Sequence, residues 1–511
     1  MDSNSTEKKQ FTGGQLFALN MALALGALIE ILDFSIANVS IPQIAASLSV
    51  TPDQGTWLIT SYSVSNAVVL PLAGWLSDYF GRVRLFVIST LLFTLMSFMC
   101  GMATSLPMLV FFRVLQGCVA GNLLPLSYAL LMDHNPKGKQ GMALGLWAMI
   151  VVVAPVIGPV VGGYITETYT WPWIFYINVP IGLFSAAYTW HMLRDKESKI
   201  IKNPVDWTGL VLLILAVGST QIMLDKGRDL GWFDSSIVLA LAVCSLISFV
   251  YFIVWTLYEP YPVVDFSLFR DPNFLTGGII MTIGYLFFFG TAVTLPLWLQ
   301  TQQGYTSYWA GVAVAPIGFF PLVLSGVVGY YLNRVDARWL TCLSFIIFSV
   351  TFFDQANFNT SVSLEHIMYV RLIQGLAVVL FFIPLVQVAL GNVPQEKYAS
   401  ASGVFNFMRI LIGSGFGTSL SVQLWMDRAG LHHYRLAETM SEYRPEVNDV
   451  YAQMSQSLPM GTVHLLTDFS VQQQAYALAT NDLSWLAGWV FLILVPFPFL
   501  CRRVQAAPVS L

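Results

Sequence analysis

The chain has 511 residues, of which 56% are hydrophobic and only 10% are charged, and its formal net charge is −4. Soluble proteins carry about 25% charged residues, so this composition excludes an ordinary soluble enzyme and favours a protein embedded in lipid. The apolar runs are long and do not alternate with polar residues, which excludes a transmembrane barrel and predicts membrane-spanning helices of about 20 residues each.

Fourteen runs of spanning length follow one another along the chain. They lie near residues 16–41, 56–76, 85–104, 107–131, 142–165, 173–193, 208–224, 237–257, 276–299, 309–331, 339–354, 364–390, 400–425 and 483–501. An even number of spans places both termini on one side of the membrane. Most Lys and Arg residues fall in the loops of that side, so we expect both termini to be cytoplasmic. The first run has no small-residue cleavage site and is expected to be an uncleaved span.

The first span carries two carboxylates, Glu30 and Asp33, whose spacing of three residues places them on one helix face. A charge at the centre of a bilayer costs roughly 2.5–3.5 kcal/mol on insertion scales, so it is normally kept with a partner or for a function. Arg113 in the fourth span is a permanent cation that could pair with them, and Gln116 shares its face. Two interpretations are open: a structural ion pair between helices, or a pair that a proton opens and closes.

A short loop between the second and third spans concentrates charges and glycines. Its residues of interest are Gly74, Asp78, Gly81, Arg82 and Arg84. Asp78 and the two cations could form an ion-pair latch that must break before the inner side of the protein opens. The alternative is that the loop carries only the positive charge typical of a cytoplasmic loop.

The fifth span combines prolines with glycines, namely Pro155, Gly158, Pro159, Gly162 and Gly163. Proline kinks a helix, and glycines four residues apart allow another helix to approach closely. This pattern predicts a bent, closely packed helix at a contact that rocks between two states.

An internal repeat divides the chain. The pattern Arg-x-x-Gln-Gly that begins at Arg113 recurs 258 residues later, at Arg371. Parallel repeats of this size build transporters from two helix bundles, with the binding site between them near the midplane. We therefore expect a six-helix bundle over 1–195, two extra transmembrane helices over 196–275 and a second six-helix bundle over 276–511.

The segment 426–482 is long, polar and predicted to lie on the outer side. It is too long for a simple connection. Three uses are open: covering the outer opening, meeting another protein, or acting as a solvated spacer.

Together these motifs resemble the major facilitator superfamily along the whole chain, and within it the fourteen-span drug:proton antiporters. The loop 74–84 is similar to that superfamily's motif between spans 2 and 3, 113–121 to the span 4 motif of proton-coupled members, and 154–163 to the antiporter motif of span 5. The stretches 32–42, 221–227 and 432–433 are most similar to inner-membrane subunits of tripartite multidrug efflux pumps.

The resemblance implies export of amphipathic toxic compounds across the bacterial inner membrane in exchange for protons. It further implies a periplasmic adaptor protein and an outer-membrane channel as partners, with no cofactor, no metal and no nucleic acid. The chain departs from the family's pattern at Phe34, Tyr79 and Asn122, and Glu30 is an additional acid. Alternatives of the same fold are a proton-coupled uptake permease and an exporter of one specific metabolite. No nucleotide-binding P-loop occurs in the sequence, so an ATP-driven pump is excluded.

We predict that Asp33 is the main proton carrier and that Arg113 stabilises its ionised form, whereas burial favours the protonated form. Glu30 is either a second proton site or a residue that tunes Asp33. Candidate substrate-binding residues are polar, aromatic or cationic side chains of spans expected to face the cavity: Asn38, Tyr62, Asn66, Gln116, Tyr128, Trp147, Tyr285, Phe288 and Arg409. The aromatic and amide residues could equally serve packing, and Arg371 and Arg409 could equally bind backbone carbonyls or inner loops.

Overall fold

The computed structural model describes residues 13–136, 140–198, 200, 204, 206–228, 230–260, 262–332, 335–394, 397–440 and 444–502. Within these ranges every regular element is a helix and no strand occurs. The all-α membrane fold predicted from the long apolar runs is thereby confirmed. Ten helical stretches in the same ranges are long and apolar enough to cross a membrane.

The first half of the chain forms one group of packed helices. They are α1 (Gly13–Ser47), α2 (Pro52–Gly55), α3 (Trp57–Val69), η1 (Leu70–Leu72), α4 (Ala73–Phe80), α5 (Arg82–Gly101), α6 (Leu106–Ala120), α7 (Leu123–His134), α8 (Gln140–Thr168), α9 (Trp173–Tyr176) and α10 (Asn178–Leu193). Helix α1 packs against α7, α8 and α10, so the segment with the two acids lies in the interior of this group.

Two further long helices follow, α11 (Trp207–Lys226) and α12 (Ser236–Tyr258). The short helix η2 (Trp232–Asp234) lies between them, and η3 (Phe266–Arg270) follows α12. Helix α11 packs against α12 on one side and against α3 on the other. Most of α12 is exposed, which suits a helix that faces lipid on several sides.

The second half forms a second group of helices. They are α13 (Pro272–Thr301), α14 (Ser307–Val314), η4 (Ala315–Gly318), α15 (Phe319–Tyr331), α16 (Ala337–Gln355), α17 (Leu364–Leu390), α18 (Tyr398–Phe407), η6 (Met408–Phe416), α19 (Gly417–Thr439), α20 (Pro445–Ser455), α21 (Met460–Leu494) and η7 (Phe497–Leu500). Helix α13 packs against α17, α19 and α21 much as α1 packs in the first half, which agrees with the internal repeat.

Four of the fourteen predicted spans are absent from the ten apolar stretches, and each of these four regions is nevertheless helical. The span near 56–76 is interrupted by the 3-10 turn η1, which contains Pro71, and the span near 400–425 is interrupted by the nine-residue π-helix η6. The other two are α8 and the pair α9 and α10. The number fourteen therefore stays a prediction.

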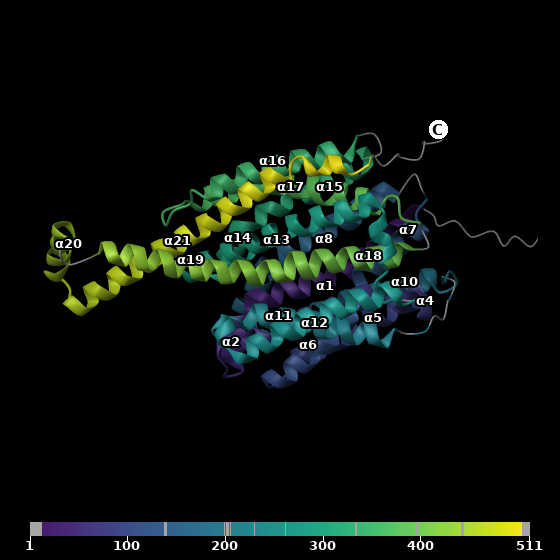
Figure 1. Cartoon of the computed structure of the whole chain (residues 1–511), viewed down its shortest axis with the longest axis horizontal. Helices are drawn as coiled ribbons and strands as arrows, with labels where there is room; N and C mark the ends of the chain where they lie inside the picture. Colours follow the sequence, from purple (N-terminus) through teal and green to yellow (C-terminus); the bar gives the residue numbers. More distant parts are fainter. Residues whose placement is uncertain are drawn as a thin grey trace, which may run out of the picture.

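Helices from the two halves meet at both ends of the molecule. We call the end beside α4, α7 and α18 the terminal end, because the described C-terminus lies there, opposite α2 and α20 (Figure 1). At the terminal end α18 packs against α4, η1 and α7. Helix α8 packs against α15 and, further from this end, against α14, where Gly311 meets the Val160 backbone. The helices α19 and α21 extend beyond the opposite end and carry α20 at their tip (Figure 1).

Candidate functional site

A buried ion pair joins α1 to α6. Arg113 donates from Nη1 to Asp33 Oδ2, and both side chains are at most 1% exposed. The same nitrogen donates to Gln116 Oε1 at 2.9 Å, and Gln116 Nε2 donates to Asp33 Oδ1 at 3.2 Å. Arg113 also donates from Nε to the Leu58 carbonyl of α3 at 3.2 Å. The predicted pairing of Arg113 with a carboxylate of the first span is therefore present, and Asp33 is that carboxylate.

A fourth helix contributes to this cluster through Asn178 at the start of α10. Its Nδ2 donates to Asp33 Oδ1 at 2.8 Å and to Ser97 Oγ at 3.0 Å. The guanidinium carbon of Arg113 lies 4.1 Å from the centre of the Tyr62 ring, a distance typical of a cation–π contact. Hydrogen bonds and the opposite charge thus compensate the ionised carboxylate inside an apolar protein.

Glycines allow the helices of this cluster to approach one another. A Cβ atom on Gly117 would lie 2.5 Å from the Tyr62 carbonyl oxygen, and one on Gly121 would lie 2.7 Å from the Asn66 carbonyl oxygen. On the other side of α1, a Cβ atom on Gly158 would lie 2.4 Å from Ser35 Oγ. Larger residues at these positions would separate α6 from α3 and α8 from α1, so the glycines set the distances within the site.

Glu30 has partners that its position in the sequence does not reveal. Asn66 donates from Nδ2 to Glu30 Oε1 at 2.9 Å, and the backbone N–H of Leu124 donates to Oε2 at 3.2 Å. That N–H is free because the fourth span breaks between α6 and α7, so Leu124 lies in the first turn of α7. A helix N-terminus favours a negative charge, which explains how Glu30 is accommodated without a direct ion pair.

Two adjoining cavities lie between the halves of the molecule. One, of about 740 Å³, has Glu30 in its wall together with residues of α3, α7, α8, α11, α13 and η6. The other, of about 810 Å³, is lined by residues of α8, α13, α14, η4, α16 and α17. They share Val151, Tyr285 and Phe289, so they are neighbouring parts of one hollow.

The predicted substrate-binding residues divide into those in the cavity walls and those elsewhere. Those in the walls are Tyr62, Asn66, Tyr285, Phe288 and Arg409. Asp33 lies behind the wall and lines neither cavity. Thus Glu30, one helical turn from Asp33, is the acid of the first span that faces the hollow.

The remaining candidates lie outside both cavities. Gln116 belongs to the Asp33 cluster, and Asn38 donates to the Phe34 carbonyl of its own helix at 3.2 Å. Tyr128 and Trp147 are buried with ring centres 5.8 Å apart. Tyr128 also packs on Tyr398 of α18, which places these two aromatic residues in the contact between the halves.

The two buried arginines of the second half bind neutral side chains. Arg409 donates to Tyr285 Oη at 2.9 Å and to Asn406 Oδ1 at 2.6 Å. Arg371 donates from Nη1 to Gln374 Oε1 at 2.6 Å. Neither arginine forms an ion pair with a carboxylate among the described residues.

In the loop motif the charged residues pair within the first half. Arg82 binds Asp133 at 2.6 Å, and Arg84 lies 4.0 Å from Glu197. Asp78 forms no ion pair with any residue that the structure describes. Burial raises the pKa of its carboxyl group, and the nearby charge of Arg82 opposes this shift. The predicted latch at Asp78 is therefore not formed in this conformation within the described part of the chain.

Two positions of the loop motif require glycine, each for a different structural reason. Gly81 has φ +90°, a left-handed conformation that favours glycine, and it ends α4 beside the Glu197 side chain. A Cβ atom on Gly74 would lie 2.7 Å from the Ser400 Cα of α18. Conversely, one on Gly403 would lie 2.7 Å from the Leu70 carbonyl oxygen. Glycines on both partners thus bring the two halves into backbone contact at the terminal end.

The glycines and prolines of the fifth span lie at contacts on both sides of α8. Gly162 packs on Ile36 of α1, Gly163 is buried, and Pro159 lines the cavity that Arg371 also lines. Gly311 of α14 packs on the Val160 backbone from the other side. The side chain of Pro155, which belongs to the same predicted motif, lies outside the described residues.

The sequence analysis did not identify Asp225 of α11 as part of a cluster. This half-buried carboxylate accepts hydrogen bonds from Thr60 Oγ1 of α3 at 2.6 Å, from Gln221 Nε2 at 3.0 Å, and from Ser419 Oγ of α19. It therefore connects α11 to both halves of the molecule. The acid at the end of an apolar run was a visible signal, but two of its three partners, Thr60 and Ser419, are distant in the sequence.

Asn178 was missed for a related reason. A buried amide in an apolar span is subject to the same argument that drew attention to Asp33, since a polar group in lipid needs partners. Nothing in the sequence, however, indicates that its partner would be Asp33, which lies 145 residues away.

Comparison with known proteins yields close relatives. The model of the Major Facilitator Superfamily matches residues 23–418. The chain is 43% identical to the multidrug export protein EmrB of Haemophilus influenzae, over 96% of both chains. It is 41% identical to the fatty acid resistance protein FarB of Neisseria gonorrhoeae, over 96% of this chain and 97% of the relative.

Solved structures support the fold. A bacterial homologue of the human lysosomal transporter Spinster, in an inward-facing and unoccupied conformation, gives a TM-score of 0.57 at 16% identity and covers 96% of this chain and 97% of that chain. The human organic anion transporter MFSD10 gives a TM-score of 0.56 at 13% identity, covering 93% and 99% respectively. At these identities the likeness concerns the fold alone.

Proposed function

The chain belongs to the Major Facilitator Superfamily of membrane transporters, and from this membership we propose that it exports amphipathic toxic compounds in exchange for protons. The observation that carries the proposal is the buried pair of Asp33 and Arg113 directly behind a cavity that Glu30 lines. Relatives that share about two-fifths of their residues with this chain are named for multidrug export and for fatty acid resistance, which supports export of apolar, toxic molecules.

In the proposed cycle Asp33 is the main proton carrier. When Asp33 is ionised, its charge is compensated by Arg113, Gln116 and Asn178, which hold α1, α6 and α10 together. Protonation removes the charge that attracts Arg113 and weakens this cluster. States that open to opposite sides then exchange in populations that proton and substrate bias in opposite directions.

Glu30 is proposed to act at the cavity rather than in the cluster. It is the carboxylate in the cavity wall, and its hydrogen bonds come from Asn66 and the Leu124 N–H. In this position it can be a second proton site or tune Asp33, which lies one turn further along α1. Both roles couple occupancy of the cavity to the charge of α1.

We further propose the topology that underlies this function. The chain has fourteen spans, with a six-helix bundle over 1–195, two extra helices over 196–275 and a second bundle over 276–511. Both termini are cytoplasmic, and the protein lies in a bacterial inner membrane. A periplasmic adaptor protein and an outer-membrane channel would continue the export path, and the segment 426–482 is the proposed adaptor contact.

The test is proton release driven by substrate in proteoliposomes that contain Asp33→Asn. Because the amide has no negative charge and carries no exchangeable acid proton at neutral pH, addition of substrate should release no protons from the variant. Asp195→Asn, at a side chain that is 89% exposed, is the matched control and should behave like the parent protein. Retained proton release in Asp33→Asn would sink the assignment of Asp33.

A second measurement separates export from uptake. Cells that lack the protein should accumulate more of a toxic dye than cells that contain it. Lower accumulation in cells without the protein would instead indicate an uptake permease of the same fold.

A further inference from the structure

Arg371 is a buried cation whose hydrogen-bonding capacity is incompletely used. Its side chain belongs to the largest that are fully buried, and Gln374 is its hydrogen-bond acceptor. Its Nε and Nη2 have no acceptor among the residues that the structure describes. A guanidinium keeps its charge at any physiological pH, and burial of unpaired charged donors is costly. The arrangement therefore lacks an anionic acceptor.

The internal repeat indicates which acceptor is missing. The offset of 258 residues that relates Arg113 to Arg371 also relates Asp33 to Thr291. Thr291 is uncharged, and its hydroxyl donates to the Phe287 and Phe288 carbonyls of its own helix at 2.9 Å. The second half has thus kept the arginine and lacks the carboxylate that neutralises it in the first half.

A cavity is present beside the unpaired guanidinium. Arg371 lies in the wall of the cavity of about 810 Å³, and most of that wall is apolar, with the rings of Phe288, Phe348, Phe381 and Phe382. A ligand in this place would meet one cationic group and several aromatic surfaces.

The neighbouring cavity contains one cationic and one acidic side chain, so it does not cancel the charge of Arg371. Its wall contains Arg409, whose described partners are the neutral groups of Tyr285 and Asn406, and one carboxylate, Glu30. The two cavities together therefore carry two guanidiniums and one carboxylate in their walls. This balance favours a monovalent anion over a cation at the Arg371 side of the hollow.

We infer that Arg371 is the anchor for the carboxylate of a substrate, and that the substrates of this site are amphiphiles with one carboxylate and an apolar body. The ligand carboxylate takes the role that Asp33 has in the first half, accepting hydrogen bonds from the guanidinium, while its apolar body packs among the phenylalanine rings. An arginine fork suits this task because it can bind both oxygens of a carboxylate. The inference rests on the proposed export function and names a substrate class for it.

Equilibrium binding to the full chain in lipid nanodiscs tests this assignment with two probes that share one apolar chain, dodecanoate and dodecyltrimethylammonium. Arg371→Gln should weaken dodecanoate binding relative to the cationic probe by roughly tenfold to a hundredfold, the usual range for a lost charge-assisted hydrogen bond. The ratio of the two affinities is unaffected by a lower fraction of folded protein. Arg435→Gln, an exposed cation of α19, is the matched control and should leave the ratio unchanged.

A second variant tests the repeat argument directly and decides alone if Arg371→Gln does not fold. Thr291→Asp supplies the carboxylate at the position that the repeat equates with Asp33, and it should compete with the ligand for Arg371. Dodecanoate binding should fall at least tenfold relative to the cationic probe. An unchanged ratio in the folded variants overturns the inference. Proton-coupled export of a cationic dye by the parent protein is measured separately, so failure of the proposed function is distinguishable from failure of the Arg371 assignment.

Discussion

Glu30 and Asp33 lie one turn apart on α1 and differ in what surrounds them. Asp33 is held by Arg113, Gln116 and Asn178 and is sealed from both cavities. Glu30 faces the cavity and is held by the Asn66 amide and a backbone N–H. Asp33 is therefore neutralised by an opposite charge within the protein, whereas Glu30 can interact with a ligand that enters the hollow.

This difference predicts that Glu30→Gln changes selectivity. The substitution keeps the size of the side chain and removes the carboxyl group, so the cavity wall can no longer offer a negative charge to a bound cation, an attraction that a bound anion never had. We expect export of a monovalent cationic dye to fall roughly tenfold relative to that of a carboxylated dye, measured side by side in membrane vesicles.

The control for this prediction is Glu438→Gln, at an exposed position of α19 outside both cavities. It should leave the ratio of the two export rates unchanged. An equal loss of both dyes in Glu30→Gln would assign Glu30 to proton coupling in general and contradict a role in selectivity.

At the scale of single residues the sequence predicted the ion pair but not most of the hydrogen bonds that surround Asp33 and Glu30. Asp33 and Arg113 could be paired because two opposite charges in apolar spans need each other. The Leu124 N–H that binds Glu30 could not be predicted, since the apolar run of the fourth span continues across the break between α6 and α7. Whether an apolar run is one helix or two depends on packing, which residue type alone does not report.

At the scale of helices, the two halves approach each other at the terminal end through close backbone contacts at glycines. Gly74 of α4 packs on Ser400, and Gly403 of α18 packs on the Leu70 carbonyl. Glycines in the fifth span similarly bring α8 against α1. Smooth surfaces of this kind can separate and close again without breaking strong polar bonds, which suits a contact that must open once per transport cycle.

The contact at the terminal end predicts the effect of Gly403→Val. A Cβ atom at this position would lie 2.7 Å from the Leu70 carbonyl oxygen, so valine should hold α18 away from η1. Overpacking of this kind costs about 1–3 kcal/mol, which is enough to shift an equilibrium roughly tenfold towards a conformation open at this end. The measurement is the rate at which a membrane-impermeant maleimide alkylates a cysteine introduced at Ser400 in inside-out vesicles.

Gly326→Val is the matched control, because no atom lies within 4 Å of a Cβ atom built on that glycine of α15. Its alkylation rate should equal that of the parent protein. If Gly403→Val is alkylated no faster than the control, the two halves do not separate at this contact.

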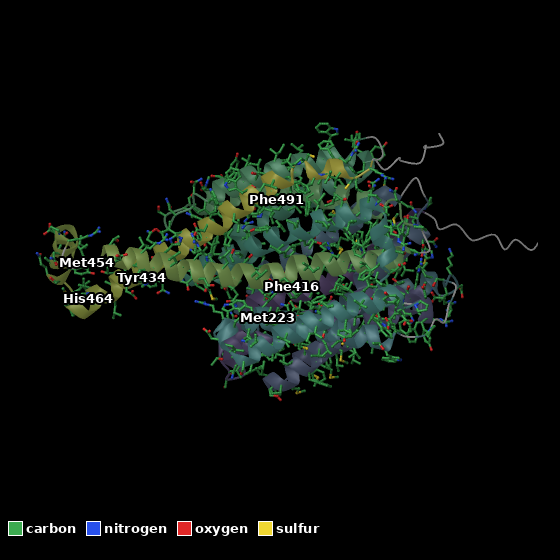
Figure 2. The ribbon with its side chains drawn as sticks, in the orientation of Figure 1. Met223, Phe416, Tyr434, Met454, His464 and Phe491 are labelled. Carbon is green, nitrogen blue, oxygen red and sulfur yellow. The ribbon has the colours of Figure 1, made fainter. Side chains whose placement is uncertain are left out.

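At the scale of the whole molecule, the helices α19 and α21 extend beyond the other helices as a hairpin, with α20 at its tip (Figure 1). We call residues 426–482 the outer hairpin. An ion pair of Asp482 with Arg428 and a hydrogen bond of Asp482 with His432 hold its two arms together near the bundle. Figure 2 shows Tyr434, Met454 and His464 in this projecting part, far from Phe491 in the bundle. The hairpin is therefore a helical extension with its own tertiary contacts.

Several large apolar side chains are exposed on the outer hairpin, among them Tyr434, Leu465 and Phe469, with exposed fractions of 69%, 73% and 52%. Exposed apolar surface on a segment that projects from the bundle and is predicted to lie outside the bilayer is typical of a protein contact. This supports the proposed adaptor as the partner of the hairpin.

The double substitution Leu465→Asp with Phe469→Asp should therefore separate two activities. Resistance of intact cells to a toxic substrate should fall at least tenfold, because the adaptor no longer binds, while transport by the purified protein in proteoliposomes should stay within twofold of the parent. The control is Gln472→Asp, a charge introduced at an exposed polar position of the same helix. Loss of transport in proteoliposomes would show instead that the hairpin takes part in the transport cycle.

The sequence predicted the architecture of the molecule better than its irregularities. Length and position of the apolar runs predicted the helices, and the repeat at Arg113 and Arg371 predicted two similar groups of them. The sequence did not predict the π-helix Met408–Phe416 or the 3-10 turn at Pro71, where the spans deviate from regular α-helix beside the contact between the halves. The end of that π-helix lies beside α11, since a Cβ atom on Gly415 would lie 3.3 Å from Gln221 Oε1. Such distortions arise from neighbouring helices that are remote in the sequence.

The two arginines that face the hollow lack a carboxylate partner of their own, and the preference for anions that follows changes how the membrane voltage contributes to export. If one proton enters for each substrate that leaves, export of a monovalent cation moves no net charge. Export of a monovalent anion moves two elementary charges inward, which gains roughly 4.6 kcal/mol at 100 mV. That energy corresponds to a concentration gradient steeper by roughly three powers of ten. With one exchange ratio, therefore, the voltage across the membrane would expel anionic substrates against far steeper gradients than cationic ones.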